Sequence, residues 1–173
     1  TNGGVTLYDA QGPQADGSSN QSFLQAMPEL EGLGEVERDR ELFRRAVQQM
    51  RANPRRVVTL AGIKFLRTWN PAPNVSSYRD WKHVAVGGGY TIAVLILAGV
   101  GLLREPGARD RQRRERRLLH ILIWSAVLYF TLVHCVYIGS VRYRVPLMPL
   151  LAIGAGAALV HRDLGARELA PQL

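Results

Sequence analysis

The chain has 173 residues, which is about one domain of ordinary size, and it carries a net charge of +8 with a single cysteine, Cys135. One cysteine excludes an intrachain disulfide and a cysteine-based metal site, and we expect Cys135 to be a small packing residue. The first residue is Thr1 and no signal peptide precedes the first polar stretch, so we expect a processed chain or a piece of a longer protein.

The placement of the positive charge favours a membrane protein over a nucleic-acid-binding protein. Residues 1–80 are nearly balanced, with ten Lys/Arg against nine Asp/Glu, whereas residues 104–117 carry seven Arg against three acids. This basic segment lies between two apolar runs and has no interleaved aromatic residues, which is typical of a cytoplasmic loop. We therefore expect a membrane, and no nucleic acid, as a partner.

The polar first part of the chain predicts a small external domain, residues 1–53. Residues 1–23 are rich in Gly, Asn, Asp and Ser and predict an ordered loop with one short strand at Val5–Tyr8. Residues 35–54, "EVERDRELFRRAVQQMRANP", predict an amphipathic helix that acids open and arginines close. The side chains expected on its apolar face are Val36, Phe43, Ala46, Val47 and Met50.

Residues 54–82 predict an interfacial helix and a linker. The stretch "PRRVVTLAGIKFLRTW" begins at Pro54, which suits a first helical turn, and mixes apolar and basic side chains. The expected apolar face consists of Val57, Val58, Ala61, Phe65 and Trp69. We expect this helix to lie in a membrane interface, with Trp69 at headgroup depth; the alternative is an ordinary helix packed on a soluble domain. The Pro-rich residues 70–81 predict a linker.

Three transmembrane helices are expected in residues 83–173. Residues 83–103 and 118–138 are free of Asp, Glu, Lys and Arg, and each would span about 31 Å as a helix, against a hydrocarbon core of about 30 Å. The third, 143–161, has an apolar stretch of only 15 residues, Pro146–Val160. It can cross the membrane only if the flanking residues Tyr143 and His161 lie at the two edges of the hydrocarbon. Its small residues Ala152 and Gly156 suit close helix contact. The predicted fold class is therefore a mainly α, polytopic membrane protein fragment.

The Arg-rich loop, residues 104–117, sets the expected topology. Under the positive-inside rule this loop faces the cytoplasm. Residues 1–82 and the turn at 139–144 then share the non-cytoplasmic face, and the tail from His161 returns to the cytoplasm.

The candidate site lies on the non-cytoplasmic face, where Arg142, Tyr143 and Arg144 precede the third helix and His134 lies inside the second. Two guanidinium groups at an interface can bind a phosphate, because each offers a planar fork of donors. A polyprenyl phosphate would have its headgroup at this depth. The alternatives are that the arginines snorkel to lipid headgroups and that His134 is a buried hydrogen-bonding residue.

The order of these segments resembles a known family. A "TNGGVTLYDAQGP" opening, a helix ending in "ANP", a basic interfacial helix, an apolar helix, an Arg-rich loop and a His-containing helix lead to "RYRVPLMPLL". This is similar to the C-terminal part of bacterial glycosyltransferases of family 39. These are relatives of dolichyl-phosphate-mannose protein mannosyltransferases and of the aminoarabinose transferase that acts on lipid A. The resemblance covers nearly the whole chain, and neither quoted end motif is a catalytic signature.

The resemblance implies a GT-C type enzyme of the bacterial inner or plasma membrane. Such an enzyme transfers a sugar from a polyprenyl-phosphate donor to an acceptor on the non-cytoplasmic face, and we expect no metal and no cofactor. By this resemblance Arg142, Tyr143 and Arg144 bind the donor phosphate. Residues Asn2, Tyr8 and Asp9 help to shape the donor or acceptor pocket, and His134 is a further candidate for it.

The catalytic carboxylate is not assigned within this chain. In the family that acid lies in the first external loop, a region that the resemblance does not cover, and neither Asp9 nor Asp80 is taken as the base. The chain is thus expected to be the C-terminal portion of a transferase and to work with the N-terminal remainder of the same enzyme. The rival is a non-catalytic membrane anchor or subunit whose external loop binds a partner protein or a glycan. A transporter segment is disfavoured, because no charge lies in mid-membrane.

Overall fold

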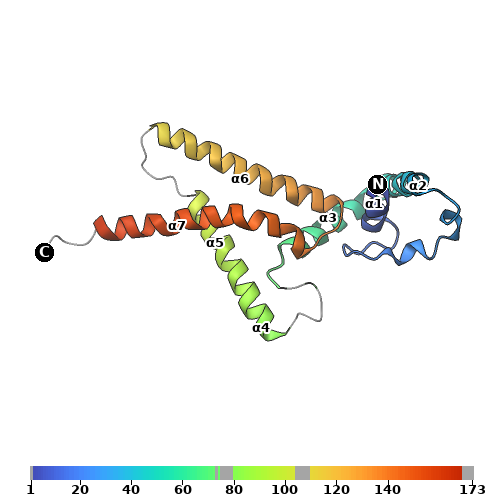
Figure 1. Cartoon of the computed structure of the whole chain (residues 1–173), viewed down its shortest axis with the longest axis horizontal. Coiled ribbons are helices and arrows are strands. Elements are labelled where there is room, and N and C mark those ends of the chain that lie inside the picture. The colour runs from blue at the N-terminus through green and yellow to red at the C-terminus, as the bar shows by residue number, and fades with distance from the viewer. Residues whose placement is uncertain (1, 73, 75–79, 104–109, 169–173) are drawn as a thin grey trace. The chain divides into compact units, whose positions relative to one another are not determined.

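The computed structural model describes residues 2–72, 74, 80–103 and 110–168, and this part of the chain is mainly helical, with no strand (Figure 1). The mainly α prediction is therefore confirmed. Half of the predicted linker at 70–81, the first part of the Arg-rich loop and the last residues of the tail lie outside the described residues. The longer helices are α1 (Gly3–Gln11), α2 (Glu35–Ala52), α3 (Pro54–Trp69), α5 (Gly89–Leu103), α6 (Asp110–Val136) and α7 (Met148–Glu168). The short elements are the 3₁₀ helices η1 (Gln21–Leu24), η2 (Pro28–Leu30) and η5 (Val141–Leu147), the turn α4 (Trp81–His83) and the π-helix η4 (Val84–Gly88).

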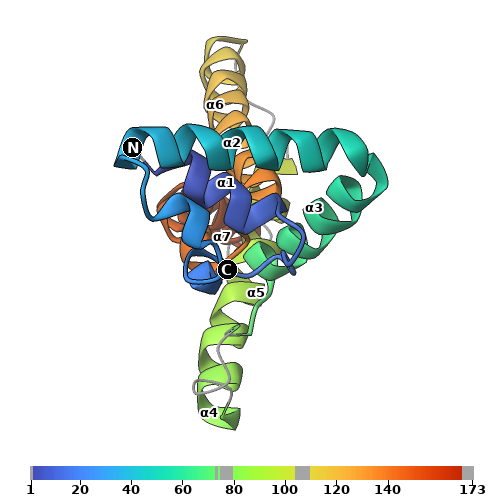
Figure 2. The same cartoon turned by 90° about the vertical axis from the view of Figure 1, so that its right-hand side faces the viewer.

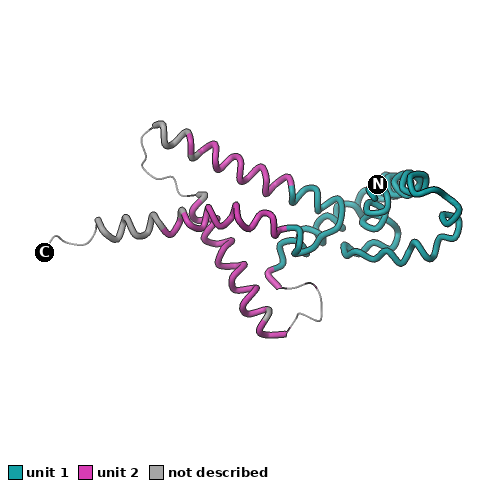
Figure 3. Tube along the Cα trace, in the orientation of Figure 1, with its two compact units in different colours: residues 1–70, 130–143 teal, residues 71–129, 144–173 magenta. Residues whose placement is uncertain are grey.

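The chain divides into two compact units (Figure 3). Unit 1 contains residues 1–70 and 130–143, and unit 2 contains residues 71–129 and 144–173. Each unit is built from segments that are distant in sequence.

Helix α1 replaces the strand that was expected at Val5–Tyr8, so that expectation is wrong. The paired glycines and the β-branched residues of this stretch disfavour an isolated helix, but α2 supplies the missing support. The Asp39 carboxylate accepts the backbone N–H groups of Gly4 (2.7 Å) and Val5 (3.1 Å), as an N-cap side chain would. A Cβ at Gly4 would overlap the Asp39 carbonyl, so glycine is what allows this close approach. Figure 2 shows α1 lying against α2.

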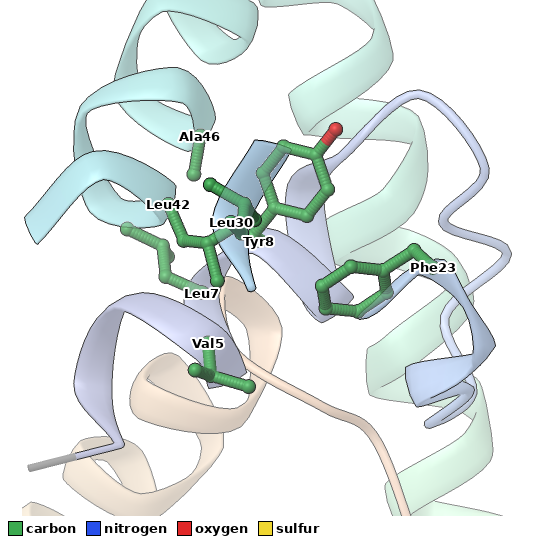
Figure 4. Close-up of a cluster of buried hydrophobic side chains, with 7 residues drawn as sticks. All are labelled: Val5, Leu7, Tyr8, Phe23, Leu30, Leu42 and Ala46. Atoms are coloured by element: carbon green, nitrogen blue, oxygen red, sulfur yellow. The ribbon is translucent and has the colours of Figure 1, made fainter. Parts of the chain in front are cut away.

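The hydrophobic core of unit 1 lies between α1, α2 and the two 3₁₀ turns (Figure 4). Its buried members are Val5, Leu7, Tyr8, Phe23, Leu30, Leu42 and Ala46. Helix α2 itself is confirmed, but its buried seam is Leu42 and Ala46, while Val36 and Phe43, which were expected on the inner face, are exposed. The cause is that α1 and the turns pack on the Leu42 side of the helix.

Helix α3 buries a row of side chains that includes two polar ones. The side chains of Leu60, Lys64 and Thr68, spaced by four residues, are buried, whereas Val58 and Phe65 are exposed. Of the five residues of the expected apolar face, Val58 and Phe65 are thus exposed, and Val57, Ala61 and Trp69 are half-buried.

In unit 2, helices α5 and α7 pack closely at a glycine contact. A Cβ at Gly101 of α5 would overlap the Gly154 carbonyl of α7, so the two backbones approach here. The contact had been expected at Ala152 and Gly156, but both are exposed and nothing lies within 4 Å of a Cβ placed on Gly156. The small residues of α7 thus indicate correctly that this helix packs closely on another, but which of its faces makes the contact depends on the position of α5.

Two helical segments are long and apolar enough to cross a membrane, Val84–Gly101 and Arg117–Val136. They correspond to the first two predicted spans. Only 28% and 11% of these windows are buried, so neither is a core helix of the described structure. The third predicted span, 143–161, stays a prediction; it begins as 3₁₀ helix η5 and continues as α7. Residues 110–117, which were expected in the loop, form the start of α6.

Candidate functional site

The C-terminal end of α6 is the point where several segments of unit 1 meet. The last carbonyl groups of a helix have no donor within the helix, so they need partners from elsewhere. The Val136 carbonyl accepts a hydrogen bond from Gln11 Nε2 at 2.6 Å and another from Lys64 Nζ at 2.8 Å. Arg67 Nε donates to the carbonyl of Gly139, three residues further on, at 3.4 Å. We call this set of contacts the α6 junction.

Lys64 is the most unusual member of the α6 junction, because its relative exposure is 0%. Burial lowers the pKa of Lys64 to about 8, since an ammonium loses its hydration in this position. The main chain also closes on it: a Cβ at Gly139 would lie 2.5 Å from the Lys64 carbonyl oxygen. A glycine at this position is therefore required for α3 to reach the end of α6.

The predicted site residues His134 and Tyr143 are brought together by the structure. Their rings stack with centroids 4.0 Å apart and an interplanar angle of 10°. Phe130, one turn before His134, adds a tilted contact at 6.4 Å. The Nδ1 atom of His134 is buried and meets no hydrogen-bond partner among the described residues. The stack fixes the turn after α6 to the helix itself.

The two predicted phosphate-binding arginines have different environments. Arg142 is exposed, and no carboxylate among the described residues pairs with it. Arg144 is 8% exposed, and its Nη2 donates to Thr91 Oγ1 at 3.3 Å, while the Thr91 hydroxyl donates to the Gly87 carbonyl of the π-helix. The divergence follows from η5, since residues two apart in a helix of three residues per turn point in different directions. Arg142 is therefore the guanidinium that a soluble or lipid phosphate can reach.

A cavity of about 250 Å³ lies beside the C-terminal end of α1. Tyr8 and Asp9 line it, together with Phe23, whose ring centroid is 5.0 Å from that of Tyr8. Asn2 does not line it; this residue is the exposed N-cap at the opposite end of α1. Both oxygens of the Asp9 carboxylate are engaged, one by the Ser19 hydroxyl at 2.8 Å and the other by the Asn20 N–H at 2.9 Å. Asp9 thus anchors the cavity wall.

Arg56 holds the loop that forms the rim of this cavity. Its guanidinium donates to the carbonyls of Gly12 (2.9 Å), Pro13 (2.9 Å) and Ala15 (2.8 Å), with a longer contact to Gln11. These carbonyls follow the end of α1, where a positive charge is favoured by the helix dipole. One side chain of α3 therefore fixes both the end of α1 and the loop after it.

Sequence reasoning missed Lys64, Arg56, Gln11 and Asp39 as organising residues. For Lys64 one signal was present, a single charge within the apolar run "VVTLAGIKFL". The other three act across distances in sequence that no local pattern reports. The described residues hold no group of three or more His, Cys, Asp or Glu side chains that could bind a metal ion.

Comparison of the chain with models of protein families, with curated proteins and with solved structures found no match.

Proposed function

We propose that this chain is the C-terminal portion of an integral-membrane glycosyltransferase that transfers a sugar from a polyprenyl-phosphate donor on the non-cytoplasmic face. The observation that carries the proposal is the exposed Arg142 guanidinium, located just beyond a helix long and apolar enough to cross a membrane. A lipid phosphate at the end of such a helix would meet a planar fork of donors.

The surroundings of Arg142 support the same proposal. The stacked rings of His134 and Tyr143 hold the turn that carries Arg142, so the backbone beneath the guanidinium is fixed in place. The cavity lined by Tyr8 and Asp9 belongs to the same unit as Arg142 and would shape the pocket for a sugar or an acceptor. Arg144 is buried in unit 2, where it donates to Thr91, so it is left out of the proposed phosphate contact. In this proposal residues 1–82 lie outside the cytoplasm, 143–161 forms a third span, and the membrane is the bacterial inner or plasma membrane.

The catalytic base is proposed to come from the N-terminal remainder of the same enzyme. An inverting displacement needs a carboxylate to take the acceptor proton. Asp9 is not assigned this role, because it is 5% exposed and its carboxylate ties Ser19 and Asn20 to α1. The same observation favours the second candidate, a non-catalytic membrane anchor or subunit with an external loop that binds a partner or a glycan.

The test is binding of polyprenyl phosphate to the native polypeptide that carries this sequence, purified in a non-ionic detergent. We expect Arg142→Ala to weaken binding by about 2 kcal/mol, or roughly 30-fold, because a charge-assisted contact is lost. The matched control is Arg40→Ala, which removes an equally charged, exposed side chain from α2. Equal affinity of the Arg142→Ala variant and the unchanged protein would count against the transferase.

The mass of that native polypeptide separates the two candidates. A longer chain with further membrane helices and an acidic external loop would support the transferase, and sugar transfer from a polyprenyl-phosphate donor could then be assayed directly. A native chain without these segments would favour the anchor or subunit.

A further inference from the structure

One exposed face of α3 is apolar. The side chains of Val58, Phe65 and Leu66 are 73%, 45% and 69% exposed. Phe65 and Leu66 follow Val58 by seven and eight residues, which is about two helical turns, so the three side chains share one face of the helix. Gly62 lies on the same face, and nothing is within 4 Å of a Cβ placed there. We call these four residues the α3 stripe. A contiguous apolar stripe of this kind marks a surface that meets something other than water.

The position of α3 in unit 1 indicates what covers the stripe. On the opposite side of the helix, Lys64 donates to Val136, the last residue of the candidate span Arg117–Val136. Arg67 reaches the Gly139 carbonyl just beyond that span. These contacts hold α3 at the level where a membrane-spanning α6 would leave the hydrocarbon. A helix fixed at that level presents its outer face to the bilayer boundary.

The charge of α3 specifies the kind of bilayer. The helix contains Arg55, Arg56, Lys64 and Arg67 and no acidic residue. Arg56 and Lys64 point inward, to the carbonyls after α1 and to Val136. Arg55 is exposed at the N-terminal end of the α3 stripe, where it can reach headgroups while the stripe is buried among acyl chains. Basic side chains at such a boundary favour anionic lipids.

We propose that the α3 stripe rests in the surface of an anionic lipid bilayer, with Arg55 on the lipid phosphates and Lys64 fixing the depth through α6. The proposal concerns how unit 1 is seated on the membrane. It requires that α6 spans, and it does not require glycosyl transfer, so binding of polyprenyl phosphate tests a separate property.

The first test places a nitroxide label at Val58→Cys or Leu66→Cys in a Cys135→Ala background, with the chain reconstituted into bilayers. The control label is at Arg40→Cys, on the exposed side of α2. Accessibility to oxygen, which concentrates in lipid, is compared with accessibility to a water-soluble nickel complex. We expect residues 58 and 66 to favour oxygen and residue 40 to favour nickel. Nickel accessibility at 58 and 66 equal to that at 40 would overturn the proposal. Low accessibility to both reagents would also overturn it, because the stripe would then be covered by protein.

The second test concerns the lipid charge and uses the same labels. The preference for oxygen at residue 58 should be greater in bilayers that contain phosphatidylglycerol than in pure phosphatidylcholine, and Arg55→Gln should remove the difference. Equal values in both bilayers would overturn the assignment of an anionic surface. Because labelled variants can misfold, the unmodified chain is also irradiated in bilayers with a phosphatidylglycerol that carries a diazirine in its acyl chain. Adducts on peptides covering 58–66 would support the proposal, and adducts confined to the two candidate spans would contradict it.

Discussion

The ammonium of Lys64 donates a 2.8 Å hydrogen bond to the carbonyl oxygen of Val136, so a fully buried charge on α3 caps the end of α6. Gln11 shares the same acceptor at 2.6 Å. The contact joins three segments of unit 1, and it carries a cost, because a buried ammonium loses its hydration. This cost makes the α6 junction sensitive to pH.

The free energy of unfolding should rise with pH between about pH 8 and about pH 10.5. The pKa of Lys64 falls from 10.5 to about 8 on folding, so in this interval the unfolded chain holds a proton that the folded chain has released. At about 1.4 kcal/mol per pH unit the full gain is about 3 kcal/mol. The measurement is thermal unfolding in detergent across this interval. The Lys64→Met variant should lack the rise; an equal rise in both proteins would assign it to other groups.

At neutral pH, Lys64→Met should change stability little, whereas Lys64→Ala should lower it by about 2–4 kcal/mol. Methionine keeps most of the buried volume and removes the buried charge, and Gln11 still donates to the Val136 carbonyl. Alanine leaves a cavity beneath α3. Unfolding midpoints of the two variants give the comparison. Equal losses in both would show that the ammonium itself, and not its volume, holds the α6 junction.

Gly139→Ala should destabilise unit 1 by about 1–3 kcal/mol, because its Cβ would meet the Lys64 main chain and push α3 from α6. Gly62→Ala is the matched control on α3, where the new methyl group meets nothing within 4 Å. That variant should be more stable by about 0.5–1 kcal/mol, since alanine favours the helix. Thermal unfolding of both variants decides; a stable Gly139→Ala protein would mean that the close approach is not required.

Adjacent glycines at the start of α1 should also respond differently. Gly4→Ala places a methyl group against the Asp39 carbonyl and should cost about 2 kcal/mol, with loss of the capping bonds to that side chain. Gly3→Ala meets nothing and should be neutral or slightly stabilising. Hydrogen exchange of α1 amides provides the readout. Equal protection of α1 in the two variants would contradict the contact.

Arg56→Ala should release the loop after α1 and lower the stability of unit 1 by about 2–3 kcal/mol, because several charge-assisted hydrogen bonds to backbone carbonyls are lost. Limited proteolysis within residues 12–16 is the direct measurement. The Arg56→Lys variant should protect residues 12–16 from proteolysis only in part, since an ammonium cannot form the same fork of hydrogen bonds as a guanidinium. Cleavage unchanged from that of the unmodified protein would argue against the role of Arg56.

The elements with strong local signals were predictable from the sequence. Helix α2 has acids at its start, arginines at its end and a stop at Asn53-Pro54, and it forms as expected. The first two apolar segments correspond to the helices that can cross a membrane. In these cases composition and periodicity act within one segment, and no distant partner is needed.

The rest depended on contacts that a local pattern does not contain. Helix α1 is capped by Asp39, which lies 35 residues after Gly4 in the chain. Because this partner is so distant, the glycine-rich sequence by itself predicted a loop. The inner face of α3 is set by the end of α6, which takes Lys64 inward and leaves Val58 outside. For the candidate site, the sequence pointed to Arg142 and Arg144 together, but the 3₁₀ geometry that separates the two side chains came only with the structure.

The donors that cap α6 precede their acceptor in the chain by 125 and 72 residues, for Gln11 and Lys64 respectively. A ribosome therefore makes both side chains long before it makes Val136. Helices α1 to α3 can associate first, through the Asp39 and Arg56 contacts. The donors Gln11 and Lys64 are then already in place when α6 is synthesised. The last turn of α6 therefore depends on side chains that were synthesised earlier. If residues 1–70 folded late, the Val136 carbonyl would lack its donors and the last turn of α6 would fray.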